Sequence, residues 1–161
     1  MKYQLPIALA LALLSTLLQI KMAWFLGWHP AFILGIGTAA ALVVPFFTLL
    51  AMLEIFFLFL HWQPLISYAL AIALAIPFML FAFRKIIYPI EGWLNAFLAT
   101  LMGVVGIHVA TLVDHGLTTP ADIRAHLQLV LLGEDMFIAC LTAIVAWALF
   151  KKFYSAAAPD K

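Results

Sequence analysis

The chain has 161 residues, of which 68% are hydrophobic and only 9% are charged, and its formal net charge is +1. A soluble domain carries about 25% charged residues, so this composition excludes an ordinary water-soluble domain and indicates an all-α, polytopic membrane protein. The near-zero net charge and the lack of a basic run exclude nucleic acid as a partner.

The first apolar run follows Lys2 and has the layout of a signal peptide, but no small-x-small cleavage site follows it around Lys21. We therefore expect this run to be retained as a first transmembrane helix. Further apolar runs are separated by charges or by clusters of Trp and Pro. Together they predict five membrane spans, or four if the first run does not insert, at 3–20, 38–60, 65–83, 93–113 and 136–150.

The apolar run 31–60 is too long for one upright span, because about 20 residues cross the hydrocarbon layer at about 1.5 Å per residue. We expect it to enter the membrane after Gly35 and Gly37 and to bend at Pro45. The last run is short, so its helix is expected to begin near Glu134.

Five spans place the two termini on opposite sides of a plasma (inner) membrane, and the positive-inside rule indicates which side is which. With the N-terminus outside and the C-terminus cytoplasmic, the outer side holds only Lys2 and Arg124. The inner side then holds Lys21, Arg84, Lys85, Lys151, Lys152 and Lys161.

The loop after the fourth span carries a helix start, since Thr119 can cap a helix whose first residue is Pro120. Ile123 and Leu127 then share one face, which predicts a short amphipathic helix on the outer face of the bundle. We expect residues 1–154 to form a single transmembrane domain and residues 155–161 a disordered tail.

The span 93–113 divides into three sectors at 100° per residue. A polar sector, expected to face the bundle interior, contains Thr100, His108, Thr111, Asp114 and His115. A stripe of small residues, expected to pack closely on another helix, contains Gly92, Ala96, Ala99, Gly103, Gly106 and Ala110. A sector of large apolar residues, expected to face lipid, contains Leu98, Leu101, Met102, Val105, Val109, Leu112 and Val113.

Glu54 lies about two helical turns inside the outer boundary and shares a helix face with His61, seven residues later. An ionised, unpaired carboxylate at that depth costs a few kcal/mol, so Glu54 is either a proton or ion site or is paired. In the second case it would hydrogen-bond to a neighbour such as Thr100 or Ser67 and serve only to hold helices together.

The outer end collects histidines and acids that could bind a divalent metal, because imidazole and carboxylate ligands suit zinc, copper or iron. These candidates are His61, His108, Asp114, His115 and His126. The alternative is that they are interfacial histidines without a ligand. Since His108 and His115 are about 10 Å apart along a helix, the pair His61 and His108, from two helices, is easier to bring to one ion.

Haem b needs two histidines on facing helices, and His61 and His108 are the candidates for it. The sequence does not favour an enzyme, because it lacks a nucleophile elbow, an H-E-x-x-H pattern and a Cys-x-x-Cys pair. We therefore expect a membrane protein whose outward-facing His/carboxylate cluster binds a cation or proton, in support of transport or of a larger membrane complex. Its partners would be the lipid bilayer and either other membrane subunits or further copies of the chain. The alternatives are a haem- or quinone-associated anchor subunit and a purely structural or assembly protein.

Overall fold

The computed structural model describes residues 4–26, 31–60, 67–87, 92–114 and 129–155. These residues form helices only, with no strand among them, which confirms the all-α prediction for the described part of the chain. The helices are α1 (Gln4–Leu26), α2 (Ala31–Val43), α3 (Phe46–Leu60), α4 (Ser67–Ile87), α5 (Gly92–Asp114) and α7 (Leu129–Ser155).

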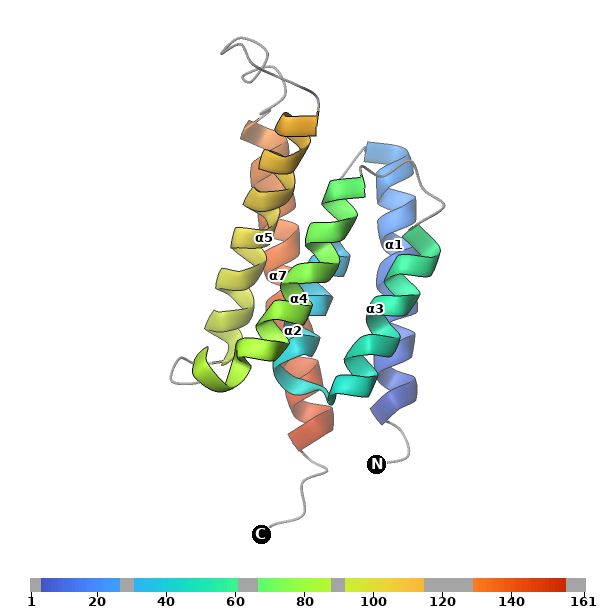
Figure 1. The fold of residues 1–161 in the computed structure, drawn as a ribbon. Helices are drawn as coiled ribbons and strands as arrows, with labels where there is room; N and C mark the ends of the chain where they lie inside the picture. Colours follow the sequence, from blue (N-terminus) through green and yellow to red (C-terminus); the bar gives the residue numbers. More distant parts are fainter. Residues whose placement is uncertain (1–3, 27–30, 61–66, 88–91, 115–128, 156–161) are drawn as a thin grey trace.

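The helices lie side by side and alternate in direction along the chain (Figure 1). As a result α1 begins and α7 ends at the same end of the bundle, which we call the terminal end. At the opposite end, the histidine end, α5 finishes and α7 begins. Termini on opposite sides of a membrane require an odd number of spans. The described helices do not support the five spans that the sequence predicts.

The difference arises in the run 31–60, which is two antiparallel helices and not one bent span (Figure 1). Proline has no N–H and disfavours helical geometry at the residue before it, so α2 stops before Val44 and Pro45. The Val44 N–H still donates to the Ala40 carbonyl at 2.8 Å, and the Pro45 carbonyl already accepts from Leu49 N–H at 3.0 Å. Pro45 therefore ends one helix and starts the next.

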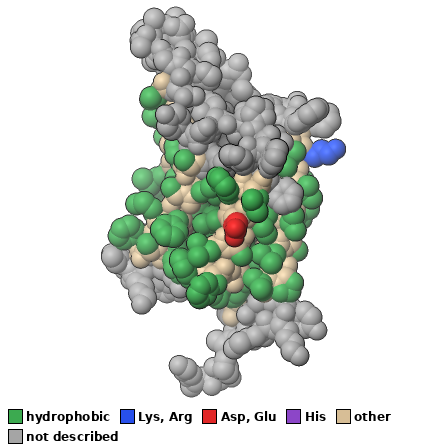
Figure 2. Space-filling model, turned by 45° about the vertical axis from the view of Figure 1, so that its right-hand side comes forward, with side chains coloured by type: hydrophobic (Ala, Val, Ile, Leu, Met, Phe, Trp, Pro, Cys, Tyr) green, Lys and Arg blue, Asp and Glu red, His purple; other side chains and the backbone are tan. Residues whose placement is uncertain are grey.

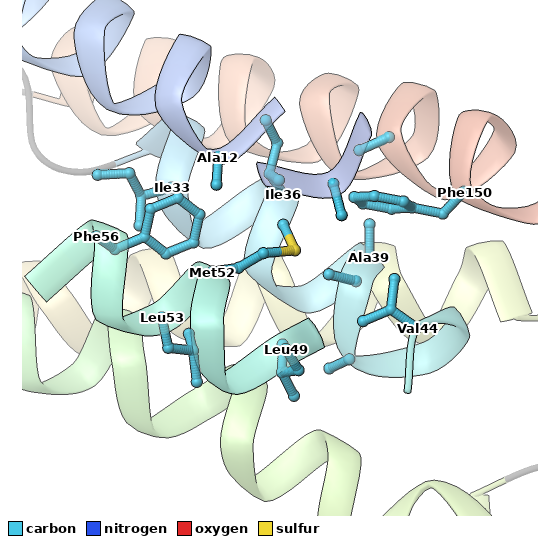
Figure 3. Close-up of a cluster of buried hydrophobic side chains, with 14 of the residues drawn as sticks. Ala12, Ile33, Ile36, Ala39, Val44, Leu49, Met52, Leu53, Phe56 and Phe150 are labelled. Carbon is cyan, nitrogen blue, oxygen red and sulfur yellow. The ribbon is translucent and has the colours of Figure 1, made fainter. Parts of the chain in front are cut away.

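Helix α2 is the centre of the bundle and contacts α1, α3, α4, α5 and α7. Its residues 33–41 are all buried. Figure 3 shows the core on one side of α2, where apolar side chains of α2 meet those of the neighbouring helices. Those labelled there are Ala12, Ile33, Ile36, Ala39, Val44, Leu49, Met52, Leu53, Phe56 and Phe150, all buried.

Two glycines allow α2 to approach its neighbours closely. A Cβ atom at Gly35 would lie 2.5 Å from the Ala139 carbonyl oxygen of α7, and one at Gly37 would lie 2.8 Å from Pro77 of α4. Both glycines therefore belong to the packed middle of α2, which begins earlier, at Ala31.

The three sectors expected for α5 agree with its burial. In the polar sector, Thr100 and His108 are buried. In the small stripe, Ala96 is fully buried, and a Cβ at Gly103 would lie 2.7 Å from a Leu34 methyl carbon. The apolar sector is the exposed one, with Leu98, Met102, Val105, Val109 and Val113 on the surface.

The surface formed by the described helices is largely apolar, as Figure 2 shows for one face. By length and apolarity two segments can cross a membrane, Gly92–Ala110 in α5 and Gly133–Tyr154 in α7. The other apolar segments are shorter, at Leu5–Lys21, Phe32–Val43, Phe46–Leu58 and Ala71–Phe83. A membrane bundle is compatible with this helical architecture.

Candidate functional site

A histidine and an aspartate meet between α5 and α7, toward the histidine end of the bundle. The Nε2 atom of His108 lies 3.1 Å from Oδ2 of Asp135. Both side chains are removed from the surface, with exposed fractions of 10% for His108 and 2% for Asp135. The structure thus assembles one buried imidazole–carboxylate pair from two helices that are distant in the sequence.

Asp135 is a site residue that sequence reasoning missed, because the start of the last helix was placed near Glu134. Helix α7 begins at Leu129, so Asp135 lies almost two turns inside it and does not belong to its first turn. It shares the buried face of α7 with Ala139, Ala143 and Ala146, whereas Glu134 points to the surface. This spacing of three and four residues was the signal available in the sequence.

The pair is set against an apolar layer. Ile107 and Val104 of α5 pack with Ala139 of α7, and Leu34 and Ala73 join this cluster from α2 and α4. In such surroundings a hydrogen bond between polar groups is stronger than in water, and leaving one group unpaired is costly. Asp135 therefore fixes the position and orientation of the His108 ring.

The chemistry open to this pair is proton exchange or cation binding. The carboxylate accepts a hydrogen bond from His108 when Nε2 carries a proton, in the protonated ring or in the Nε2–H tautomer of the neutral ring. A carboxylate on one ring nitrogen is also the usual partner of a metal-binding histidine. The pair would supply part of a metal site, and further ligands would have to come from other residues.

A second polar contact lies deeper in the bundle, where Thr38 Oγ1 of α2 is 2.6 Å from Thr100 Oγ1 of α5. The two hydroxyls also contact the carbonyl oxygens of Gly35 and Ala96 on their own helices, at 3.0 and 2.7 Å. Each hydroxyl has one hydrogen, so two of these three contacts are hydrogen bonds at any moment. Thr100 is therefore committed to Thr38, and the suggested hydrogen bond from Glu54 to Thr100 is wrong.

Glu54 does not face the interior. It lies on α3 and is exposed, and among the residues that the structure describes it has no hydrogen bond or ion pair. Its carboxyl group is thus separate from the His108–Asp135 pair. The expectation that Glu54 shares a site with His61 concerns a residue outside the described ranges. The alternative that pairs Glu54 with Ser67 concerns the first residue of α4, whose side chain the structure does not describe.

Most of the predicted metal ligands also fall outside the described part of the chain. His61, His115 and His126 lie in the gaps between the described ranges, and Asp114 is the last residue of α5 with an undescribed side chain. Within the described ranges, no three His, Cys, Asp or Glu side chains come together. The metal site therefore stays a prediction, with His108 as its one described member. The predicted amphipathic helix after Thr119 lies largely outside the described ranges too.

An open groove of about 280 Å³ runs between α1, α2 and α7. Its lining is almost entirely hydrocarbon, and its two hydroxyls are already used, since Ser15 donates to the Ala12 carbonyl and Thr142 to the Ile138 carbonyl. The described residues that line it include no histidine. The groove is apolar, and its described lining residues offer the haem alternative no axial ligand.

No protein-family model, curated protein sequence or solved structure matches this chain.

Proposed function

We propose that this chain is an integral membrane protein whose His108–Asp135 pair binds a proton or a cation on the outer side, in support of transport or of a larger membrane complex. The observation that carries the proposal is the burial of this pair between α5 and α7. A buried ionisable pair contributes less to stability than a well-packed apolar contact would. Its presence in so apolar a bundle therefore favours a functional role.

The membrane location is supported by the surface of the bundle, where large apolar side chains are exposed on every described helix except the central α2. Most surfaces of water-soluble proteins avoid extended apolar patches, whereas a lipid-facing surface is built from them. A role within a larger complex is favoured over independent transport, because transport needs a continuous polar path across the bundle. On the inner side of the pair, the apolar residues Val104 and Ile107 separate His108 from Thr100.

We propose a plasma (inner) membrane location with both termini in the cytoplasm, which revises the orientation expected from five spans. In the alternating bundle the terminal end collects most of the basic residues, and the positive-inside rule places that end in the cytoplasm. By chain order these are Lys2, Arg84, Lys85, Lys151, Lys152 and Lys161. The histidine end retains only Lys21 and Arg124, and so faces outward.

Labelling of single cysteines in intact cells checks this orientation. In a Cys140→Ala background, a cysteine replacing Gly116 is expected to react with a membrane-impermeant thiol reagent. Cysteines replacing Lys2 and Lys152 are expected to react only after the cells are opened. Labelling of the Lys2 position in intact cells would reject the shared cytoplasmic side and restore termini on opposite sides.

Metal content and histidine titration test the site itself. Protein purified in mild detergent without chelator is analysed for zinc, copper and iron, and His108 is followed by NMR of labelled histidine across pH. Either a stoichiometric metal lost in both His108→Ala and Asp135→Asn, or a His108 ring that titrates with the protein folded, supports the proposal. His29→Ala, at a histidine that is not among the predicted ligands, serves as the control. A metal-free protein whose His108 does not titrate would leave the pair a structural contact.

The absorbance spectrum of the same sample examines the haem alternative. A Soret band lost in His108→Ala would replace the proton or cation site by a haem b site.

A further inference from the structure

The open groove between α1 and α7 has a buried floor and apolar rims. Its buried members are Ser15, Ile36 and Ala146, one each from α1, α2 and α7. Its rims are large apolar side chains that are 36–54% exposed, namely Leu14, Leu18, Leu141, Val145 and Leu149. We call this site the α1–α7 groove. It is open along its length to whatever surrounds the bundle.

The size of the α1–α7 groove suits a hydrocarbon chain and not a helix. Leu141 and Leu149 are about 12 Å apart along α7, at about 1.5 Å per residue. A helix segment of that length and of about 10–12 Å diameter occupies roughly 1,000 Å³, several times the groove volume of about 280 Å³. A protein helix would therefore lie across the rims without reaching the floor. A single file of methylene groups is far narrower and fits between the rims.

The lining matches hydrocarbon and needs no polar ligand. Its two hydroxyls donate to carbonyl groups of their own helices, at 2.8 Å from Ser15 and 2.7 Å from Thr142. No charged side chain is among the described residues that line the groove. In a bilayer the hydrophobic effect does not favour such a groove over the surrounding lipid. A chain is therefore retained only if it packs well and if its polar end is held at the membrane surface.

Lys152 is placed to hold that polar end. It follows Leu149 by three residues, so it lies about 4.5 Å further along α7 and about 60° around it, within the sector that lines the groove. Its side chain is exposed at the terminal end of the bundle (Figure 1). Lys151 lies on another face of α7, where its Nζ atom is 4.8 Å from the centroid of the Trp147 ring.

We infer that the α1–α7 groove holds one acyl chain of a phospholipid with an anionic headgroup, and that Lys152 binds this headgroup. The inference rests on the membrane location and orientation proposed above, which place Lys152 at the cytoplasmic leaflet, where anionic lipids concentrate. The chain enters sideways from the bilayer between the rims, and the Lys152 ammonium group contacts the lipid phosphate as a point charge. The bound lipid fills the space between α1 and α7 and stabilises their packing on α2.

Native mass spectrometry of the full chain in mild detergent tests the headgroup contact. It measures binding of dioleoyl phosphatidylglycerol, which is anionic, and of dioleoyl phosphatidylcholine, which has the same acyl chains and no net charge. We expect tighter binding of phosphatidylglycerol. Lys152→Gln should weaken it about fivefold, the effect of one basic residue at an anionic surface, and should leave phosphatidylcholine unchanged. Equal binding of the two lipids to the native chain would overturn the inference.

Two other lysines provide the controls. Lys151→Gln removes the same charge from the neighbouring residue, and Lys21→Gln removes the exposed lysine of α1 beyond the opposite end of the groove. Both variants are expected to bind phosphatidylglycerol as the native chain does. An equal loss in Lys151→Gln would reduce the effect to general attraction by basic residues. A loss in Lys21→Gln alone would move the headgroup to the other end of the groove and overturn the role of Lys152.

A substitution at the rim tests the groove itself. Val145→Trp places a large ring across the opening, whereas Val105→Trp adds the same ring at an exposed position of α5 outside the groove. We expect Val145→Trp to weaken the binding of both lipids about tenfold, because the acyl chain loses its contacts with the floor, and Val105→Trp to weaken neither. Circular dichroism checks that both variants are folded. Equal affinities in the two variants would overturn the groove as the site of the chain.

Alkaline carbonate extraction of native membranes distinguishes this inference from the proposed function. A chain that stays in the membrane but shows no preference for phosphatidylglycerol overturns only the lipid site. A chain released by carbonate overturns the membrane location and the lipid site with it.

Discussion

Replacing His108 by Leu is expected to lower the free energy of unfolding by about 3–5 kcal/mol, because the substitution leaves the Asp135 carboxylate buried without its imidazole partner. Asp135→Val should be destabilising for the converse reason. The double variant is expected to fall within about 1 kcal/mol of the native protein, since an apolar pair removes both desolvation costs together. The measurement is unfolding in mild detergent by SDS titration, followed by circular dichroism.

The double-mutant cycle supplies its own control, because only coupled residues give non-additive changes. Val105→Leu, at an exposed position of the same helix, should change the stability by less than about 0.5 kcal/mol. If the effects of the two single substitutions simply add in the double variant, the 3.1 Å contact between His108 and Asp135 is not an energetic pair. That result would also remove the main support for the proposed site.

Gly35→Ala is expected to destabilise the bundle by about 2–3 kcal/mol, although alanine is intrinsically the better helix former by about 1 kcal/mol. The added Cβ would lie 2.5 Å from the Ala139 carbonyl oxygen and 3.1 Å from the Ala143 nitrogen, both backbone atoms of α7. A flexible side chain could move aside, but here the two helix backbones would have to separate. Thermal denaturation in detergent measures the loss.

Two other glycines provide the comparison. A Cβ at Gly133 of α7 meets nothing within 4 Å, and one at Gly106 of α5 is 3.7 Å from an Ile72 carbon, an ordinary contact. Gly133→Ala and Gly106→Ala are therefore expected to leave the melting temperature unchanged or to raise it. A Gly35→Ala protein as stable as these two would mean that α2 and α7 are not in backbone contact.

Periodicity predicted the parts of the fold in which each helix has one buried and one exposed side. The polar, small and apolar sectors of α5 follow from a 100° rotation per residue, and the burial of Thr100, His108 and Gly103 agrees with them. On α1, Ala8, Ala12, Ser15 and Gln19 share one face at the same rotation per residue, and all four are buried. These predictions need no knowledge of which helices are neighbours.

The reversal at Pro45 could not be read in this way. The residues on both sides of the turn are apolar, as in a continuous buried helix, and the usual Gly, Asn or Asp of a turn is missing. Proline alone fits a bend as well as a break. The packing of α3 on α1, two segments distant in the sequence, favours the break.

Of the two residues of the candidate site, the sequence predicted His108 but not Asp135. His108 stands out on α5 because its sector contains other polar residues, but Asp135 follows Glu134, and two adjacent acids suggest a helix start. Whether Asp135 is a charge in the first turn of α7 or a buried ligand depends on where α7 begins. A sequence pattern locates the ends of a helix less precisely than the helix itself. The 3.1 Å contact with His108 required the packing of α7 on α5.

In the membrane location proposed above, the short hairpin of α2 and α3 would have a further consequence for the surrounding bilayer. At about 1.5 Å per residue, the 15 residues of α3 extend about 22 Å, against about 40 Å for the 27 residues of α7. A hydrocarbon layer is about 30 Å thick, so α3 is shorter than the layer and α7 is longer. Such hydrophobic mismatch is relieved by local thinning of the bilayer, by tilt or by oligomerisation. We expect the protein to prefer thin membranes and to deform thick ones on the side of α3.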